Sequence, residues 1–264
     1  MPEDLAERVA KTIEDLPSLP SVAQQALAMM ADPSTEPEEL ERVLSRDPGL
    51  ALRVLRLANS AYYRRAREVK TLSGAIVLLG FKTVHTLVLG SAVHRLLSRA
   101  GRVAEPLWLH CYGVGLACRE WARRVRRTVR FDPEEAFLAG LFHDVGKGVI
   151  AVRFPGLYDR HVDTEGEREA LGFDHAELGG LLLERWEIPG SIGEAVTGHH
   201  EASPRGLGLL VKGADWLVEE IAPGVGRAPG PRPGGLEALG ASEELFEAVC
   251  EAVRSGLAEE GSGP

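Results

Sequence analysis

The residues of this chain that could do chemistry are histidines and aspartates gathered beyond residue 100. Six of the eight histidines lie beyond residue 100, most of them inside or at the ends of apolar stretches. Imidazole and carboxylate ligands together suit Fe, Mn, Zn or Ni, and carboxylate-rich sites also admit Mg. The sequence therefore predicts a site for one or two divalent metal ions. The residues that could be ligands are His110, His143, Asp144, His175, His199, His200 and Asp215, together with His161, which we expect to be structural or to lie on the surface.

The stretch Phe137–Ile150, FLAGLFHDVGKGVI, carries the pair His143-Asp144 in its middle. Its apolar residues recur at three- and four-residue steps, which predicts that its first part is a buried helix. A buried imidazole and carboxylate without partners would be costly, so hydrogen bonds or a metal ion must satisfy them. Neighbouring side chains on a helix point about 100° apart. The pair could therefore hold one ion from two sides, or two ions with Asp144 between them.

Each candidate also has an interpretation without metal. His143 and Asp144 could form a hydrogen-bonded pair that fixes helix contacts. His199 and His200 could be the polar end of a short helix and cap its carbonyl groups. Asp215 could accept a hydrogen bond from a histidine N–H, and His110, beside two aromatic residues, could be an ordinary half-buried histidine.

Strand signals are scarce, so the predicted fold class is all-α, a two-lobed helical bundle. We expect an N-terminal helical lobe over 1–100, a second helical lobe with the candidate metal site over 101–222, and a Pro/Gly-rich loop with a C-terminal helix over 223–264. The expected helices cover about 3–15, 21–31, 36–46, 48–63, 74–79, 81–98, 105–125, a central stretch from 132, 174–188, 191–197, 206–221 and 241–257.

Several residues mark where these helices should begin or end. Thr35 with Glu38 forms a capping-box pattern. Ser73 is expected to cap a short helix that Gly80 ends. Two further caps are predicted at Asp47 and Asp174.

Three segments lack a helical pattern. Residues 154–167 are expected to form a looser connection. Residues 223–235, PGVGRAPGPRPGG, are too rich in proline and glycine for a regular element. The tail from Glu259 has no apolar residue to anchor it, so we expect it to fray.

Composition limits the class of protein. The chain is 44% hydrophobic and has a net charge of −9, which argues against nucleic-acid binding as its main activity. Its three cysteines have no metal-binding spacing and are expected to be reduced thiols in a cytoplasmic protein. The acidic, amphipathic N-terminus does not fit a signal peptide. We find no uninterrupted apolar run of transmembrane length, so no membrane association is expected.

The order of the candidate ligands resembles the ligand series of the HD superfamily of metal-dependent phosphohydrolases, and is most similar to the HD-GYP branch and its relative, the HDOD domain. The resemblance covers about residues 11–221, and its motifs are highly specific when taken together. The stretches that resemble the HDOD domain are LPSLP at 16–20, DPGLALRVLRLANSAYY from Asp47, LSGAIVLLG from Leu72, FLAGLFHDVGKGVI, DHAELGGLLLERWEIPGSI and TGHHE.

The resemblance implies a non-catalytic regulatory module of bacterial signalling, since HDOD domains generally serve as output or scaffolding modules. Its expected partner is a signalling protein or a nucleotide signal. The superfamily also implies an alternative, a metal-dependent phosphohydrolase acting on phosphodiesters or nucleotides. In that mechanism metals activate a water, Asp144 bridges or orients them, and Lys147 binds the substrate phosphate. Ala202–Arg205 stands where HD-GYP proteins carry their glycine-rich segment, which weakens the case for hydrolysis of cyclic di-GMP.

Overall fold

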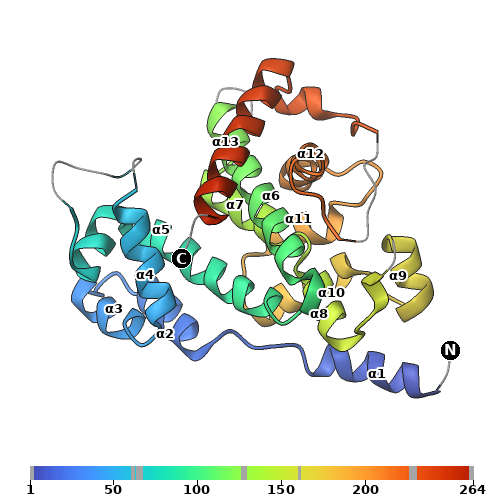
Figure 1. Cartoon of the computed structure of the whole chain (residues 1–264), viewed down its shortest axis with the longest axis horizontal. Helices are drawn as coiled ribbons and strands as arrows, with labels where there is room; N and C mark the ends of the chain where they lie inside the picture. Colours follow the sequence, from blue (N-terminus) through green and yellow to red (C-terminus); the bar gives the residue numbers. More distant parts are fainter. Residues whose placement is uncertain are drawn as a thin grey trace. The chain divides into compact units, whose positions relative to one another are not determined.

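The computed structural model describes residues 3–60, 63, 68–125, 130–159, 162–225 and 231–261 (Figure 1). These residues form helices and no strand, so the all-α prediction is confirmed. The chain divides into two compact units, Leu19–His94 and a second made of Met1–Ser18 with Arg95–Pro264. The residues up to Ser18, which we expected in the lobe over 1–100, therefore group with the second unit.

The unit Leu19–His94 is a small helical bundle. Its core includes Leu40, Leu44 and Val54, each fully buried. Helix α3 does not start with the predicted capping box, because Glu36 rather than Thr35 takes the cap position and its N–H donates to Glu39. The helices are α2 (Ser21–Ala31), α3 (Pro37–Leu44), α4 (Pro48–Ala58) and most of α5 (Leu72–Leu97).

Side chains fix both ends of α4. Asp47 caps the helix as predicted, since its Oδ1 accepts a hydrogen bond from the N–H of Leu50 at 3.1 Å. At the other end Asn59 exchanges two hydrogen bonds with the backbone of Val69, both at 2.9 Å. The helix consequently ends at Ala58, earlier than the predicted 63.

Helix α5 contains a break at Gly80, where φ is 77° and ψ is 155°. The predicted helix end at Gly80 is thus confirmed, but the predicted cap at Ser73 is wrong, because Thr71 accepts the hydrogen bond from Gly74 N–H. Among the described residues, α5 alone is long and apolar enough to span a membrane. In the most apolar window of α5, 44% is buried inside the structure.

The second unit is organised around α6. Helices α7, α12 and α13 pack against α6, while α10 packs against α8 and α11 (Figure 1). Trp121 of α6 is fully buried, and its indole N–H donates to the carbonyl of Leu239. The elements are α1 (Glu3–Glu14), η1 (Gly101–Val103), α6 (Ala104–Arg124), α7 (Pro133–Phe142), α8 (Val145–Arg153), η2 (Leu157–Asp159), α9 (Thr164–Leu171), α10 (His175–Arg185), α11 (Gly190–Gly198), α12 (Gly206–Val218), η3 (Leu236–Leu239) and α13 (Glu243–Gly261).

Two segments are more regular than the sequence predicted. The connection over 154–167 contains η2 and the start of α9, which Asp163 caps by accepting a hydrogen bond from Gly166 N–H. Helix α13 continues to Gly261, so the predicted fraying from Glu259 is wrong as far as that residue, and 262–264 lie outside the described residues. The described parts of 223–235 contain no regular element, as predicted.

Candidate metal centre

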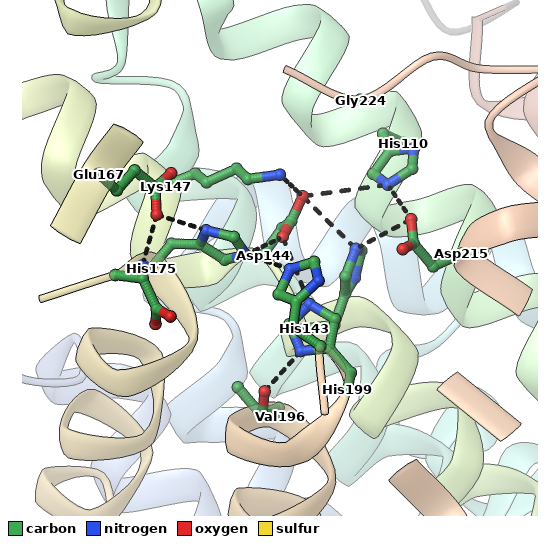
Figure 2. Close-up of polar contacts among 12 residues, drawn as sticks. His110, His143, Asp144, Lys147, Glu167, His175, Val196, His199, Asp215 and Gly224 are labelled. Atoms are coloured by element: carbon green, nitrogen blue, oxygen red, sulfur yellow. Dashed lines mark hydrogen bonds and ion pairs between the residues drawn. The ribbon is translucent and has the colours of Figure 1, made fainter. Parts of the chain in front are cut away.

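His143 and Asp144 lie where α7 ends and α8 begins, not inside one continuous helix as we expected. Asp132 caps the start of α7, and the helix ends at Phe142. Asp144 has φ −106° and ψ 13°, outside the helical region. The break lets both side chains point toward one centre (Figure 2).

Two close helix crossings bring other candidate ligands to this junction. A Cβ on Gly140 would lie 2.7 Å from a backbone oxygen of α6, so α7 lies directly against α6. This crossing brings the rings of His110 and His143 to 5.1 Å between centroids. A Cβ on Gly146 would lie 2.0 Å from the carbonyl oxygen of His175, so the start of α8 lies against the start of α10.

The remaining ligands sit at the ends or inner faces of three helices. Asp174 caps α10 as predicted, accepting from Glu177 N–H at 2.8 Å, and so fixes His175 at the first position of the helix. His199 ends α11, and Asp215 lies on the buried face of α12. His199, Asp215 and His175 are each at most 2% exposed.

Four histidines share one hydrogen-bonding pattern. Each Nδ1 lies against an oxygen that can only accept a hydrogen bond, so each Nδ1 carries a proton, and each Nε2 is the atom that faces the centre. His110 Nδ1 lies 2.8 Å from the carbonyl oxygen of Ala222, and His143 Nδ1 lies 2.7 Å from that of Gly140. His199 Nδ1 lies 2.6 Å from the carbonyl oxygen of Val196, and His175 Nδ1 lies 2.7 Å from a carboxylate oxygen of Glu167 (Figure 2).

The inward-facing atoms form two sets, each with its members within 4.8 Å of one another. The first ligand group is Asp144, His175, His199 and His200, and the second ligand group is His110, His143 and Asp215. In the first group, His175 Nε2 lies 3.0 Å from Asp144 Oδ1 and 2.9 Å from His200 Nε2. In the second, His110 Nε2 lies 3.2 Å from Asp215 Oδ1. All seven predicted ligands therefore belong to one cluster, whereas His161 lies outside the described residues.

Asp144 connects the two groups. Its Oδ1 faces the first group, while its Oδ2 lies 3.5 Å from His143 Nε2 and 4.0 Å from His110 Nε2. A carboxylate placed in this way can bridge two metal ions.

Several of these buried atoms have no hydrogen-bond partner among the described residues. They include Nε2 of His143 and Nε2 of His199, whereas Oδ1 of Asp144 faces His175 Nε2 at 3.0 Å. Leaving a buried polar atom unsatisfied costs about 1–3 kcal/mol. Imidazole nitrogen atoms without partners that converge with carboxylate oxygens in one place are the donor set expected for Fe, Mn, Zn or Ni. The residues therefore fit a metal centre better than the predicted alternative of a hydrogen-bonded structural pair.

Lys147 forms a buried ion pair with Asp144. Its Nζ lies 2.6 Å from Asp144 Oδ2, and the residue is only 4% exposed. Burial opposes both charges, but His143, Lys147 and His175 hold the pKa of Asp144 well below its usual range. Burial likewise lowers the pKa of Lys147, yet Asp144 outweighs it and raises that pKa overall. Both groups are therefore charged at neutral pH.

The pKa values of the histidines in the centre shift in opposite directions. Burial lowers the pKa of His143 to about 4. Burial, with His143 and His175 nearby, lowers the pKa of His199 to about 3. For His110 burial also acts downward, but the hydrogen bond and charge of Asp215 outweigh it and raise the pKa. At neutral pH His143 and His199 are thus neutral and able to bind metal.

Three residues near the centre escaped the sequence analysis. Glu167 is fully buried and accepts hydrogen bonds from the backbone N–H of His175, from its Nδ1, and from the Tyr158 hydroxyl at 2.6 Å. Glu219 lies 3.8 Å from His110 Nδ1. Nothing in the spacing of these residues distinguishes them from surface glutamates and core tyrosines. The ion pair of Lys147 with Asp144, three residues apart, did have a signal in its helical spacing.

Comparison with known protein families decides the family. The model of the HDOD domain matches residues 16–202, well over half of the chain. The chain belongs to the HDOD family. As an HDOD protein it is 23% identical over 205 residues to an uncharacterized protein of Treponema pallidum, and it spans only 40% of that protein's length.

Solved structures share the fold over almost the whole chain. An HDOD domain protein of unknown function from Geobacter sulfurreducens is 24% identical, with 97% of this chain and 94% of that chain covered and a TM-score of 0.69. A Marinobacter aquaeolei protein, provisionally described as a signal transduction protein, is 24% identical with 96% and 64% covered and a TM-score of 0.72. A Shewanella amazonensis protein, provisionally described as a metal-dependent phosphohydrolase, is 17% identical with 96% and 98% covered and a TM-score of 0.69.

Proposed function

We propose that this HDOD protein is a regulatory module of bacterial signalling, located in the cytoplasm, that holds two metal ions at the first and second ligand groups. The observation that carries the metal part is the shared ring orientation of four histidines. Every Nδ1 is occupied by an acceptor outside the centre, and every Nε2 faces inward. Such outer partners orient metal-ligating histidines and raise their basicity. Similarity to one protein provisionally described as a signal transduction protein supports the regulatory part.

Iron, manganese, zinc, nickel and magnesium remain the candidate metals, with the histidine-rich ligand sets favouring the first four. Four of the seven ligands come from helix ends or the α7–α8 junction, so metal would fasten several helices at one point. A ligand or partner protein that shifts one of these helices would then alter the centre. The expected partner is a signalling protein or a nucleotide.

Elemental analysis of the purified full chain tests this proposal. We expect about two metal ions per chain, as in two-metal sites, and their loss in His143→Ala and Asp144→Ala. His85→Ala is the matched control, because His85 lies in the other unit and belongs to neither ligand group. If the wild-type chain binds none of the five metals, the proposal fails.

A second candidate function is metal-dependent phosphohydrolysis. The position of Asp144 between the two ligand groups favours it, because two-metal hydrolases use such a centre to activate water and to stabilise a phosphoryl group. Metals bound there would lower the pKa of a water molecule. Lys147 would bind phosphate only after exchanging its ion pair with Asp144.

The test of this second function is release of phosphate or nucleotide from a panel of phosphodiesters and nucleotides, with Mn or Fe supplied. Turnover should vanish in the His143→Ala/Asp144→Ala double variant and persist in His85→Ala. Equal rates for the wild type and the double variant would exclude hydrolysis at this centre.

A further inference from the structure

A cavity of about 290 Å³ lies in the second unit, apart from the ligand groups. The turn η1, the end of α8 and the turn η2 form its walls. Its lining combines cationic, aromatic and apolar groups, which is the composition of a small-molecule site. The lining residues that matter here are Arg99, Arg102, Val152, Pro155, Tyr158 and Asp159.

The charged groups of the cavity favour an anion. Arg102 forms an ion pair with Asp159, and both side chains remain accessible at 73% and 43% exposure. Arg99 has no ion-pair partner among the described residues, so its guanidinium group is available. Guanidinium groups bind phosphate through paired hydrogen bonds. The two arginines outnumber the one carboxylate of the lining, that of Asp159, so the net charge of the lining is positive.

The remaining lining indicates what the anion is attached to. Val152 is 43% exposed although it is apolar, and it lines the cavity together with Pro155 and the aromatic residue Tyr158. These surfaces suit a flat, apolar group such as a nucleobase. A volume of about 290 Å³ is at the lower end for ligand pockets, so it fits one nucleotide and is too small for a dinucleotide.

Tyr158 links this cavity to the metal centre. It lines the cavity, and its hydroxyl donates to Glu167 Oε1 at 2.6 Å. The other oxygen of Glu167 accepts from His175 Nδ1 at 2.7 Å, and His175 Nε2 lies 3.0 Å from Asp144 Oδ1. The chain from cavity to centre therefore consists of three consecutive short polar contacts between buried side chains.

We propose that the cavity binds a mononucleotide, with its phosphate on Arg99 and Arg102, and that Tyr158 and Glu167 transmit occupancy to His175. The transmission rests on the proposed metal function, whereas the binding does not. A bound nucleotide restrains Tyr158 and so holds Glu167 and His175 in their ligating positions. Metal binding at the first ligand group becomes tighter when the cavity is filled, and by linkage nucleotide binds more tightly to the metal-loaded chain.

Calorimetric titration of the full chain with AMP and GMP tests the site. Arg99→Ala should weaken binding of at least one nucleotide about tenfold or more, the usual effect of losing a charge-assisted contact. Val152→Trp, which fills the open side of the cavity, should abolish it. Arg56→Ala and Arg254→Ala, at exposed positions on other helices, are the controls and should bind normally. Failure of both nucleotides to bind, or equal binding by Arg99→Ala, overturns the site.

Two fragments and one further variant complete the test. Adenosine and inorganic phosphate should each bind more weakly than AMP, and equal binding by either refutes a mononucleotide. In the wild type, saturating AMP or GMP should tighten Mn affinity about threefold or more, within the usual range of allosteric coupling. Tyr158→Phe should still bind nucleotide, but nucleotide should no longer tighten its Mn affinity. If nucleotide does not tighten Mn affinity in the wild type, or still does so in Tyr158→Phe, transmission through Tyr158 is refuted. A chain that binds nucleotide but no metal would contradict the proposed function and leave the site standing.

Discussion

Replacing Glu167 by glutamine should weaken metal binding without unfolding the chain. Glu167 is fully buried and accepts three hydrogen bonds, two from His175 and one from Tyr158. Glutamine has the same shape but no charge, and one of its two terminal groups is a donor. Glu167→Gln therefore removes the charge that orients the His175 ring and raises the basicity of its Nε2.

The size of the effect follows from the contacts to His175. Two of the three hydrogen bonds, from the backbone N–H at 2.8 Å and from Nδ1 at 2.7 Å, change from charge-assisted to neutral. A charge-assisted bond exceeds a neutral one by about 1 kcal/mol, so the total loss is about 2 kcal/mol. At about 1.4 kcal/mol per tenfold change this is roughly 30-fold in affinity. Loss of an outer partner of a ligating histidine typically costs about 10–100-fold.

The assay is competition for Mn or Zn against a chromophoric chelator, which resolves two binding steps. The weakened step should be the one that depends on His175, tested with His175→Ala, while the step of the second ligand group changes less. Glu169→Gln makes the same chemical change at an exposed position of α9 and serves as the control. Wild-type affinity at both steps in a folded Glu167→Gln variant would refute the argument that Glu167 tunes the centre.

Three further outcomes follow from burial and packing. The pKa of His199 is about 3 in the folded chain and about 6.5 in the unfolded chain, so as pH falls the unfolded state binds the proton first and stability is lost from about pH 6.5 downward. In urea titrations of metal-free protein, His199→Ala should therefore lose less stability than the wild type between pH 7 and pH 5. Equal losses would contradict this. Gly146→Ala should lower the free energy of unfolding by about 1–3 kcal/mol or more through overpacking, because its Cβ would meet a backbone oxygen at 2.0 Å. Gly193→Ala, which has open space around its Cβ, should leave the free energy of unfolding unchanged or raise it in the same titration. Cys250 alone should react with a thiol reagent at pH 8 in the folded chain, because the other two cysteines are buried and burial raises their pKa values. Rapid reaction of all three would show that the core opens.

The sequence predicted the fold class, the ligand set and several helix ends, because these depend on local patterns. Asp47 and Asp174 act as caps within three residues of their partners, and Gly80 interrupts α5 through its own φ angle. The ligands were identifiable because histidine in an apolar stretch is rare without a partner. The resemblance to HDOD proteins added that these residues form one ligand series, which their spacing alone did not establish.

What the sequence did not predict depends on contacts between distant segments. The break between α7 and α8 at Asp144 has no proline or glycine to mark it, since the pair of His143 and Asp144 is held by tertiary contacts. Glu167 looks like its exposed neighbours on α9, and only the fold places it against His175. Cap positions were misassigned by one or two residues at Thr35 and Ser73, because several adjacent side chains could serve.

The ion pair between Asp144 and Lys147 affects how such a centre would decay over evolution. Losing a histidine removes a ligand, but replacing Asp144 strands the ammonium group of Lys147, which is 4% exposed. Breaking a buried pair from one side costs about 3–5 kcal/mol. A descendant with no use for metal would therefore keep the aspartate and the lysine for folding while its histidines drift. Among relatives, histidines at positions 110, 175 and 199 would then indicate a centre that still binds metal. An aspartate followed three residues later by lysine would indicate only that the ion pair has been kept for stability.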